Sequence, residues 1–71
     1  MVERVQLKGA HRGYKRGALF HVRGGRIWEQ TSHEYDYQYA YAPDAQLEAN
    51  GSRGRIKVDG HSEWVEVKKI K

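Results

Sequence analysis

The fold is decided by a stretch in the first half of the chain, which reads Ala18-Leu19-Phe20-His21-Val22-Arg23-Gly24-Gly25-Arg26-Ile27-Trp28. Ala18, Phe20 and Val22 stand at every second position. Because successive side chains of a β-strand point to opposite faces, this run predicts a half-buried strand. The pair Gly24-Gly25 then accepts the positive φ angles that a tight hairpin needs. The stretch therefore predicts a strand, a tight turn and a returning strand.

The same period of two continues on both sides of this hairpin. Three further pairs of apolar residues stand two positions apart, namely Val5 with Leu7, Ile56 with Val58, and Val65 with Val67. Asn50-Gly51 and Asp59-Gly60 are again turn dipeptides, and they separate these runs at short intervals. This spacing is typical of a small antiparallel barrel or sandwich, not of alternating strands and helices.

The core is expected to come from the apolar positions of these strands. At least one of the two tryptophans, Trp28 and Trp64, is expected to be buried with them. The predicted core comprises Val5, Leu7, Phe20, Val22, Ile27, Trp28, Ile56, Val58, Val65 and Val67.

Two local structures compete for residues 43–51. Pro43 suits the first turn of a helix, and Asp44 favours a helix N-terminus. The apolar content is Leu47 plus alanines, which is little to anchor a helix that is already marginal at this length. We therefore expect a short edge strand that ends at the turn Asn50-Gly51.

Length and composition bound the class of protein. The chain has 71 residues, and we expect a single small β-barrel domain over residues 1–71. It contains no cysteine, which excludes disulfides, thiol catalysis and zinc sites built on cysteine. No stretch approaches the roughly 20 apolar residues of a membrane span, and no signal-peptide pattern opens the chain. We therefore expect a cytoplasmic protein with no membrane partner.

Charge is unevenly distributed along the sequence, whose net charge is +4. Residues 27–52 hold five acidic residues and no Lys or Arg, and the rest of the chain holds 13 basic and four acidic residues. The two parts therefore carry −5 and +9. If the fold keeps them apart, the surface has a basic and an acidic face, which suits a polyanion or a second copy of the chain.

A row of tyrosines is the most informative feature, with Tyr35, Tyr37, Tyr39 and Tyr41 at every second position. On a strand, all four rings would lie on one face. One interpretation is a core strand whose hydroxyls reach the rim of the barrel. The other is an exposed row that binds a partner, either by stacking on nucleic-acid bases or by packing against a second subunit or a protein ligand. Because acidic residues stand beside the row, we favour a protein partner there over nucleic acid.

A second candidate surface is the basic loop, residues 8–17, which contains three glycines. Its candidate nucleic-acid-binding residues are Lys8, Arg12, Tyr14, Lys15 and Arg16. Basic side chains with an interleaved aromatic ring are typical of a surface that binds phosphates and bases. The alternative is a solvated loop on a basic protein. Arg53, Arg55 and Lys57 form a second basic strip, and the sequence does not say whether it joins the loop.

Support for catalysis or metal binding is weak. The four histidines have no metal-ligand spacing, and His33-Glu34 begins like a zinc-protease motif but has Tyr37 where the second histidine would stand. A metal site brought together by folding stays open. No serine has the context of a nucleophile elbow. We therefore expect no enzyme, no cofactor, no metal site and no small-molecule substrate.

Residues 17–70 resemble a group of small, uncharacterised bacterial proteins. The matching residues are Leu19-Phe20, Gly25, Ile27-Trp28-Glu29-Gln30-Thr31, the tyrosine ladder from Tyr35 to Tyr41 with its closing Pro43, Ile56-Lys57-Val58-Asp59-Gly60, and Val65 with Val67. The resemblance implies a small SH3-like barrel, which agrees with the alternation above, and we expect five or six antiparallel strands. It implies no activity, and the basic loop lies outside it except for its last residue.

Two functions are consistent with these features. The favoured one is a non-enzymatic interaction module that forms a homo-oligomer or binds a protein partner through its tyrosines. The alternative is a nucleic-acid-binding module, with Arg12, Lys15 and Arg16 on phosphates and Tyr14 stacked on a base. Salt separates the two, because phosphate contacts weaken steeply as salt rises.

Overall fold

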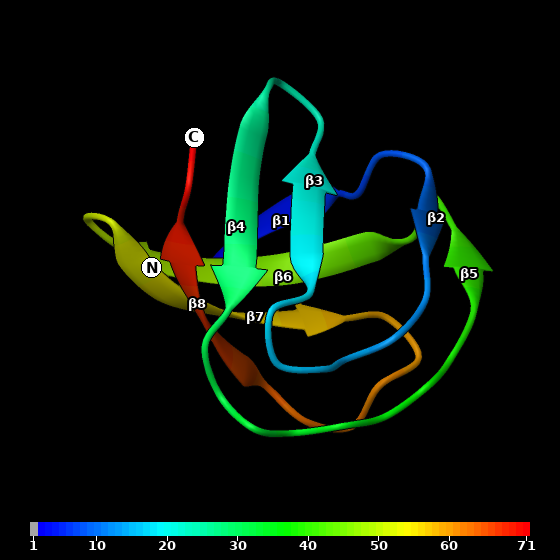
Figure 1. The fold of residues 1–71 in the computed structure, drawn as a ribbon. Coiled ribbons are helices and arrows are strands. Elements are labelled where there is room, and N and C mark those ends of the chain that lie inside the picture. Colours follow the sequence, from blue (N-terminus) through cyan, green and yellow to red (C-terminus); the bar gives the residue numbers. More distant parts are fainter. Residues whose placement is uncertain (1) are drawn as a thin grey trace.

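A computed structural model of the protein describes residues 2–71, and all of their regular elements are strands (Figure 1). These are β1 (Val2–Gln6), β2 (Ala10–His11), β3 (Leu19–Val22), β4 (Arg26–Gln30), β5 (Ala40–Tyr41), β6 (Asp44–Asn50), β7 (Arg53–Val58) and β8 (Val65–Lys69). Six of them form one antiparallel sheet in the order β1-β6-β7-β8-β4-β3, and β2 pairs with β5 separately. The all-β class expected from the sequence is confirmed.

The six-stranded sheet curls until its two ends meet. Beyond the end of β1, Leu7 forms an antiparallel bridge with Val22 of β3. Next to this bridge, the backbone N–H of Lys8 donates a hydrogen bond to the carbonyl of His21 over 2.7 Å. The first and last strands of the sheet are thereby joined, so the fold is barrel-like, as the expected SH3-like barrel of five or six antiparallel strands requires.

The predicted turns are present. Gly24 and Gly25 join β3 to β4 with φ angles of 105° and 98°. Gly51 lies between β6 and β7 with φ of 67°, and Gly60 follows β7 with φ of 101°. Because side chains are disfavoured at positive φ, these glycines allow the chain to reverse within a few residues.

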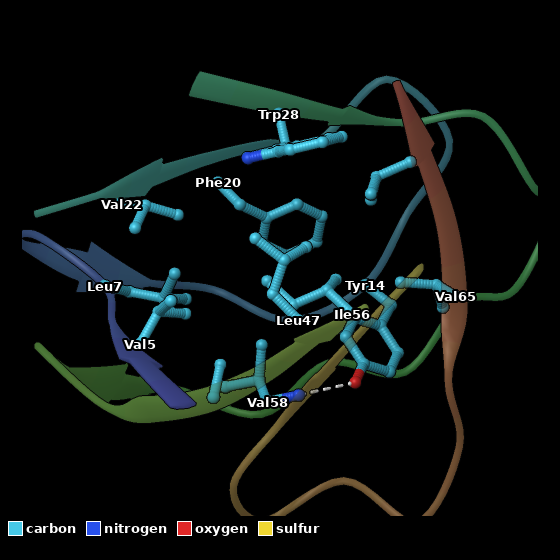
Figure 2. Close-up of a cluster of buried hydrophobic side chains, with 12 residues drawn as sticks. Val5, Leu7, Tyr14, Phe20, Val22, Trp28, Leu47, Ile56, Val58 and Val65 are labelled. Atoms are coloured by element: carbon cyan, nitrogen blue, oxygen red, sulfur yellow. Dashed lines mark hydrogen bonds between the residues drawn. The ribbon is translucent and has the colours of Figure 1, made fainter. Parts of the chain in front are cut away.

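The core lies inside the curled sheet, where Phe20 stands between Trp28 of β4 and Leu47 of β6 (Figure 2). Nine of the ten residues predicted for the core are buried. The exception is Ile27, which is half-buried. It is the neighbour of Trp28 on β4, and neighbouring side chains of a strand face opposite sides. The buried Trp28 also confirms that at least one tryptophan is in the core.

Strand β6 was expected at an edge of the sheet, and this part of the prediction is wrong. The segment is a strand and not a helix, but it pairs with β1 on one side and with β7 on the other. Ala45 and Leu47 are completely buried. Their modest apolar content is sufficient because both side chains face into a core that the neighbouring strands already enclose.

The remaining chain forms an end layer, made of the basic loop (residues 8–17) and the tyrosine segment (residues 35–41). In Figure 1, β2 and β5 lie side by side at one end of the barrel, outside the six-stranded sheet. The regular strand that would align the tyrosines is absent from residues 31–39. Instead, the carboxylate of Asp36 contacts Nδ1 of His61 and accepts a hydrogen bond from Gln38 within the same segment.

Candidate functional site

The four tyrosines of the tyrosine segment are exposed. Tyr35, Tyr37, Tyr39 and Tyr41 have 73%, 62%, 60% and 75% of their surface accessible. Of the two interpretations that the sequence left open, the core strand is therefore wrong, and all four rings are available to a partner.

The tyrosine segment is held against the basic loop by backbone contacts. The N–H of Tyr14 donates to the carbonyl of Asp36 over 2.9 Å, and the N–H of Asp36 donates back to Tyr14 over 3.1 Å. Gly13 has a φ of 101°, and a Cβ there would contact the carbonyl oxygen of Asp36 and lie 2.7 Å from the Cα of Tyr37. Only glycine therefore allows the two segments to approach this closely.

Tyr14 is buried, with 1% of its surface exposed. Its hydroxyl donates to the carbonyl of Glu63 over 2.9 Å. The same hydroxyl accepts from the backbone N–H of Val58 over 3.0 Å (Figure 2). Burial raises the pKa of Tyr14 to about 12. The predicted role of Tyr14 in stacking on bases is wrong, because the ring closes the end of the core and has no free face.

Two buried histidines connect the same segments. The Nε2 atoms of His11 and His61 are 3.0 Å apart, and Nδ1 of His61 is 2.9 Å from Oδ2 of Asp36. Tyr14 stacks on the ring of His61 with 3.8 Å between centroids. Burial, with a smaller contribution from the charge of His61, lowers the pKa of His11 to about 4. At neutral pH, His11 is therefore uncharged and supports a chain of hydrogen bonds that ends at the tyrosine segment.

The sequence left open a metal site whose ligands come together only in the folded chain. No such site is found among residues 2–71. The part of the chain that the structure describes contains no group of three or more His, Cys, Asp or Glu side chains that could hold a metal ion. His11 and Asp36 approach different nitrogens of His61, so they do not converge on one point.

The acidic and basic parts of the sequence are not separated by the fold. Strand β6 lies between β1 and the basic strand β7, and its Glu48 accepts a hydrogen bond from Arg55 of β7 over 2.6 Å. Asp44 of β6 and Asp59 both lie near Arg4 of β1, at 3.5 Å and 2.9 Å. The sheet thus neutralises much of its own charge.

The cations of the basic loop have no such partners. Lys8, Arg12, Lys15 and Arg16 are exposed. None of them forms an ion pair with any residue within 2–71. Unpaired cations on one loop keep an attractive potential for anions, while cations paired within the sheet lose most of theirs.

Part of the basic loop and part of the tyrosine segment line one groove of about 450 Å³, here called the basic groove. Lys8, Arg12 and Lys15 line it together with Tyr35 and Tyr37. No aspartate or glutamate is among its lining residues. Arg16, Tyr39 and Tyr41 lie outside it. Two surfaces that were predicted separately therefore meet at one groove, although the basic loop ends at residue 17 and the tyrosine segment begins at residue 35.

The second basic strip does not join the basic groove. Arg53 and Arg55 line another groove, of about 630 Å³, whose lining also includes Glu48 and Glu66. The guanidinium of Arg55 lies over the ring of Trp64, 4.7 Å from its centroid. The two grooves share no lining residue, and only the basic groove lacks acidic side chains.

Comparison of the chain with models of protein families, with curated proteins and with solved structures finds no match in any of the three. Residues 2–71 contain no helix with the length and apolar character needed to cross a membrane. The two grooves and the end layer are therefore the features of this molecule that bear on its function.

Proposed function

We propose that the protein is a non-enzymatic, cytoplasmic binding module for nucleic acid, and that its binding surface is the basic loop. One observation carries the proposal: Lys8, Arg12 and Lys15 line a groove that contains no acidic side chain. Phosphates bind such a surface by displacing counterions, and this term supplies most of the non-specific affinity for nucleic acid.

The same charge argues against a symmetric dimer across the basic groove. A two-fold axis through it would bring Lys8, Arg12 and Lys15 close to their own copies, because an isologous interface uses the same surface on both subunits. Like charges that face each other weaken association. A polyanion is the complementary ligand.

The proposal can be tested by fluorescence anisotropy with a labelled oligonucleotide. A length of about 10 nucleotides is within the range that small barrels cover. We expect binding that weakens roughly tenfold between about 50 mM and about 200 mM salt, as a few phosphate contacts require. The double variant Arg12→Glu with Lys15→Glu should lose more than tenfold in affinity, since it reverses two of these contacts.

The matched control is Arg53→Glu with Lys57→Glu, which changes the net charge by the same amount on the second basic strip. We expect it to retain most of the affinity. Equal losses in both double variants would mean that overall charge, and not the basic loop, is responsible, and would overturn the proposal.

Self-association through the outer tyrosines is the second candidate. Tyr39 and Tyr41 are 60% and 75% exposed and lie outside the basic groove, so a second copy could cover them without facing the cations. Light scattering should then report a mass above the 8.3 kDa of one chain, and Tyr39→Ala should lower it. A wild-type mass of one chain would contradict this candidate.

A further inference from the structure

We propose that the basic groove is specific for single strands, with unpaired bases stacked on Tyr35 and Tyr37 and the adjacent phosphates on Lys8, Arg12 and Lys15. The inference rests on the proposed function and names its ligand class. It comes from the position of two exposed rings beside three cations that lack acidic partners.

The two rings stand on backbone that is fixed. Asp36 lies between Tyr35 and Tyr37, and its N–H and carbonyl are both hydrogen-bonded to Tyr14. Gly13 packs directly against the backbone of Asp36 and Tyr37. A surface that is ordered before binding spends less free energy on ordering when the ligand arrives. The rings are therefore exposed side chains on a segment that the barrel holds in place.

The acidic residues beside the tyrosines do not oppose a phosphate chain in this groove. The carboxylate of Asp36 is 2.9 Å from Nδ1 of His61 and accepts a hydrogen bond from Gln38 over 3.3 Å. Neither Asp36 nor Glu34 lines the groove. The acidic residues next to the tyrosines therefore do not exclude a phosphate chain here, because Asp36 is paired with the buried His61.

The apolar part of the groove favours bases over a bare phosphate. Leu19 lines it and is 52% exposed, and the buried Phe20 also contributes to its lining. Aromatic and apolar surfaces stack on the faces of bases without regard to sequence. In a duplex those faces are covered by neighbouring base pairs, so only an unpaired strand can present them to Tyr35 and Tyr37.

The test compares three labelled probes of one length by fluorescence anisotropy at near-physiological salt. The probes are a single strand, the duplex of that strand, and a strand of abasic sugar phosphates. All three carry phosphates, but only the single strand offers free base faces. We expect the single strand to bind about tenfold or more tightly than the other two, as stacking on one or two rings gives.

The double variant Tyr35→Ala with Tyr37→Ala should remove this preference and bring the single strand down to the affinity of the abasic strand. The double variant Tyr35→Phe with Tyr37→Phe keeps both ring faces and should retain the preference. Tyr41→Ala, which removes an equally exposed ring outside the groove, should also retain it. Because these side chains are exposed, the variants should unfold at the wild-type temperature.

The outcomes separate this inference from the proposed function. Equal affinity for the three probes, with the salt dependence intact, would overturn the inference and leave charge-driven binding of nucleic acid. An unchanged preference in the double alanine variant would also overturn it. No binding of any probe would overturn both.

Discussion

The six-stranded sheet and the end layer are stabilised in different ways. Eleven of the twelve apolar residues of the buried core belong to the sheet or continue its first strand, and Tyr14 is the one that the end layer contributes. The tyrosine segment is instead attached through directed contacts, among them the Tyr14–Asp36 bridge and the bond from His61 to Asp36. Apolar burial is spread over many atoms, whereas a polar contact depends on one geometry. We therefore expect single substitutions at these contacts to affect the tyrosine segment more than the barrel.

The two regions also differ in charge. In the sheet, Arg4, Arg26 and Arg55 each pair with an acidic side chain. In the end layer, the cations of the basic loop pair with no residue between 2 and 71. Surface ion pairs add little to stability, so this difference concerns binding more than folding. Within residues 2–71, Arg53 and Lys57 of β7 also lack an ion pair, but Arg53 lines a groove that Glu48 and Glu66 share. The basic loop differs in that its unpaired cations line a groove without acidic side chains.

Of the substitutions considered, Gly13→Ala is expected to destabilise the end layer most. An added Cβ would collide with the carbonyl of Asp36, and alanine is also strained at a φ of 101°. We expect a loss of more than about 2 kcal/mol in the free energy of unfolding, or release of the tyrosine segment from the barrel. Amide exchange should accelerate at Tyr14 and Asp36 more than in β6 and β7, which pair deep in the sheet.

The matched control for this substitution is Gly17→Ala. Gly17 has a similar φ of 86°, but a Cβ there would meet no atom within 4 Å. It should cost only the backbone strain, about 1–2 kcal/mol, and should not change exchange at Asp36. Equal effects at the two positions would show that the close approach of Gly13 to the tyrosine segment does not hold the end layer.

The contrast between the regions also explains what the sequence could predict of the fold. Alternation reports which face of a strand is buried, so it identified nine of ten core residues from the sheet. It failed at Ile27 because two adjacent large residues, Ile27 and Trp28, cannot both face inward. It missed Tyr14, which stands in a glycine-rich loop without alternation. Burial of Tyr14 depends on partners more than 40 positions away, at Val58 and Glu63.

Only part of the candidate site could be predicted from the sequence. The residue types of the tyrosine row and the basic loop pointed to binding surfaces, since exposed rings and cations have recognisable chemistry in any sequence. Their meeting at one groove depends on the pairing of β2 with β5 and on the Tyr14–Asp36 bridge, which are long-range contacts. The glycine at position 13 was a local signal, because it separates Arg12 from Tyr14 and allows the close approach.

A smaller loss of stability is expected when the hydroxyl of the buried Tyr14 is removed, and the exposed Tyr37 provides the comparison. Tyr14→Phe keeps the ring in the core but leaves the buried N–H of Val58 and the carbonyl of Glu63 without the hydroxyl. We expect a loss of about 1–2 kcal/mol in urea unfolding, the usual result of leaving a buried polar group unpaired. Tyr37→Phe makes the same chemical change on an exposed ring and should have almost no effect. Equal losses in the two variants would contradict the structural role assigned to Tyr14.

The smallest expected effect concerns pH and the buried histidine pair. The pKa of His11 is lowered to about 4 by burial, with a smaller contribution from the charge of His61. In the unfolded chain a histidine titrates near pH 6.5, so the unfolded state binds a proton to this residue before the folded state does. A group with a depressed pKa in the folded state therefore stabilises the fold above pH 6.5. This stabilisation is lost as the pH falls from 6.5 towards 4.

Urea unfolding at pH 7 and pH 6 measures this dependence, for which we expect at most about 1 kcal/mol from His11. The variant His11→Gln keeps a donor that can reach His61 but does not titrate, so its stability should fall less over the same interval. His33→Gln, at an exposed position of the chain, should keep the wild-type dependence. If His11→Gln and the wild type lose equal stability, the histidine pair does not link the end layer to protonation. The end layer would then depend on the Gly13 contact and on the hydroxyl of Tyr14.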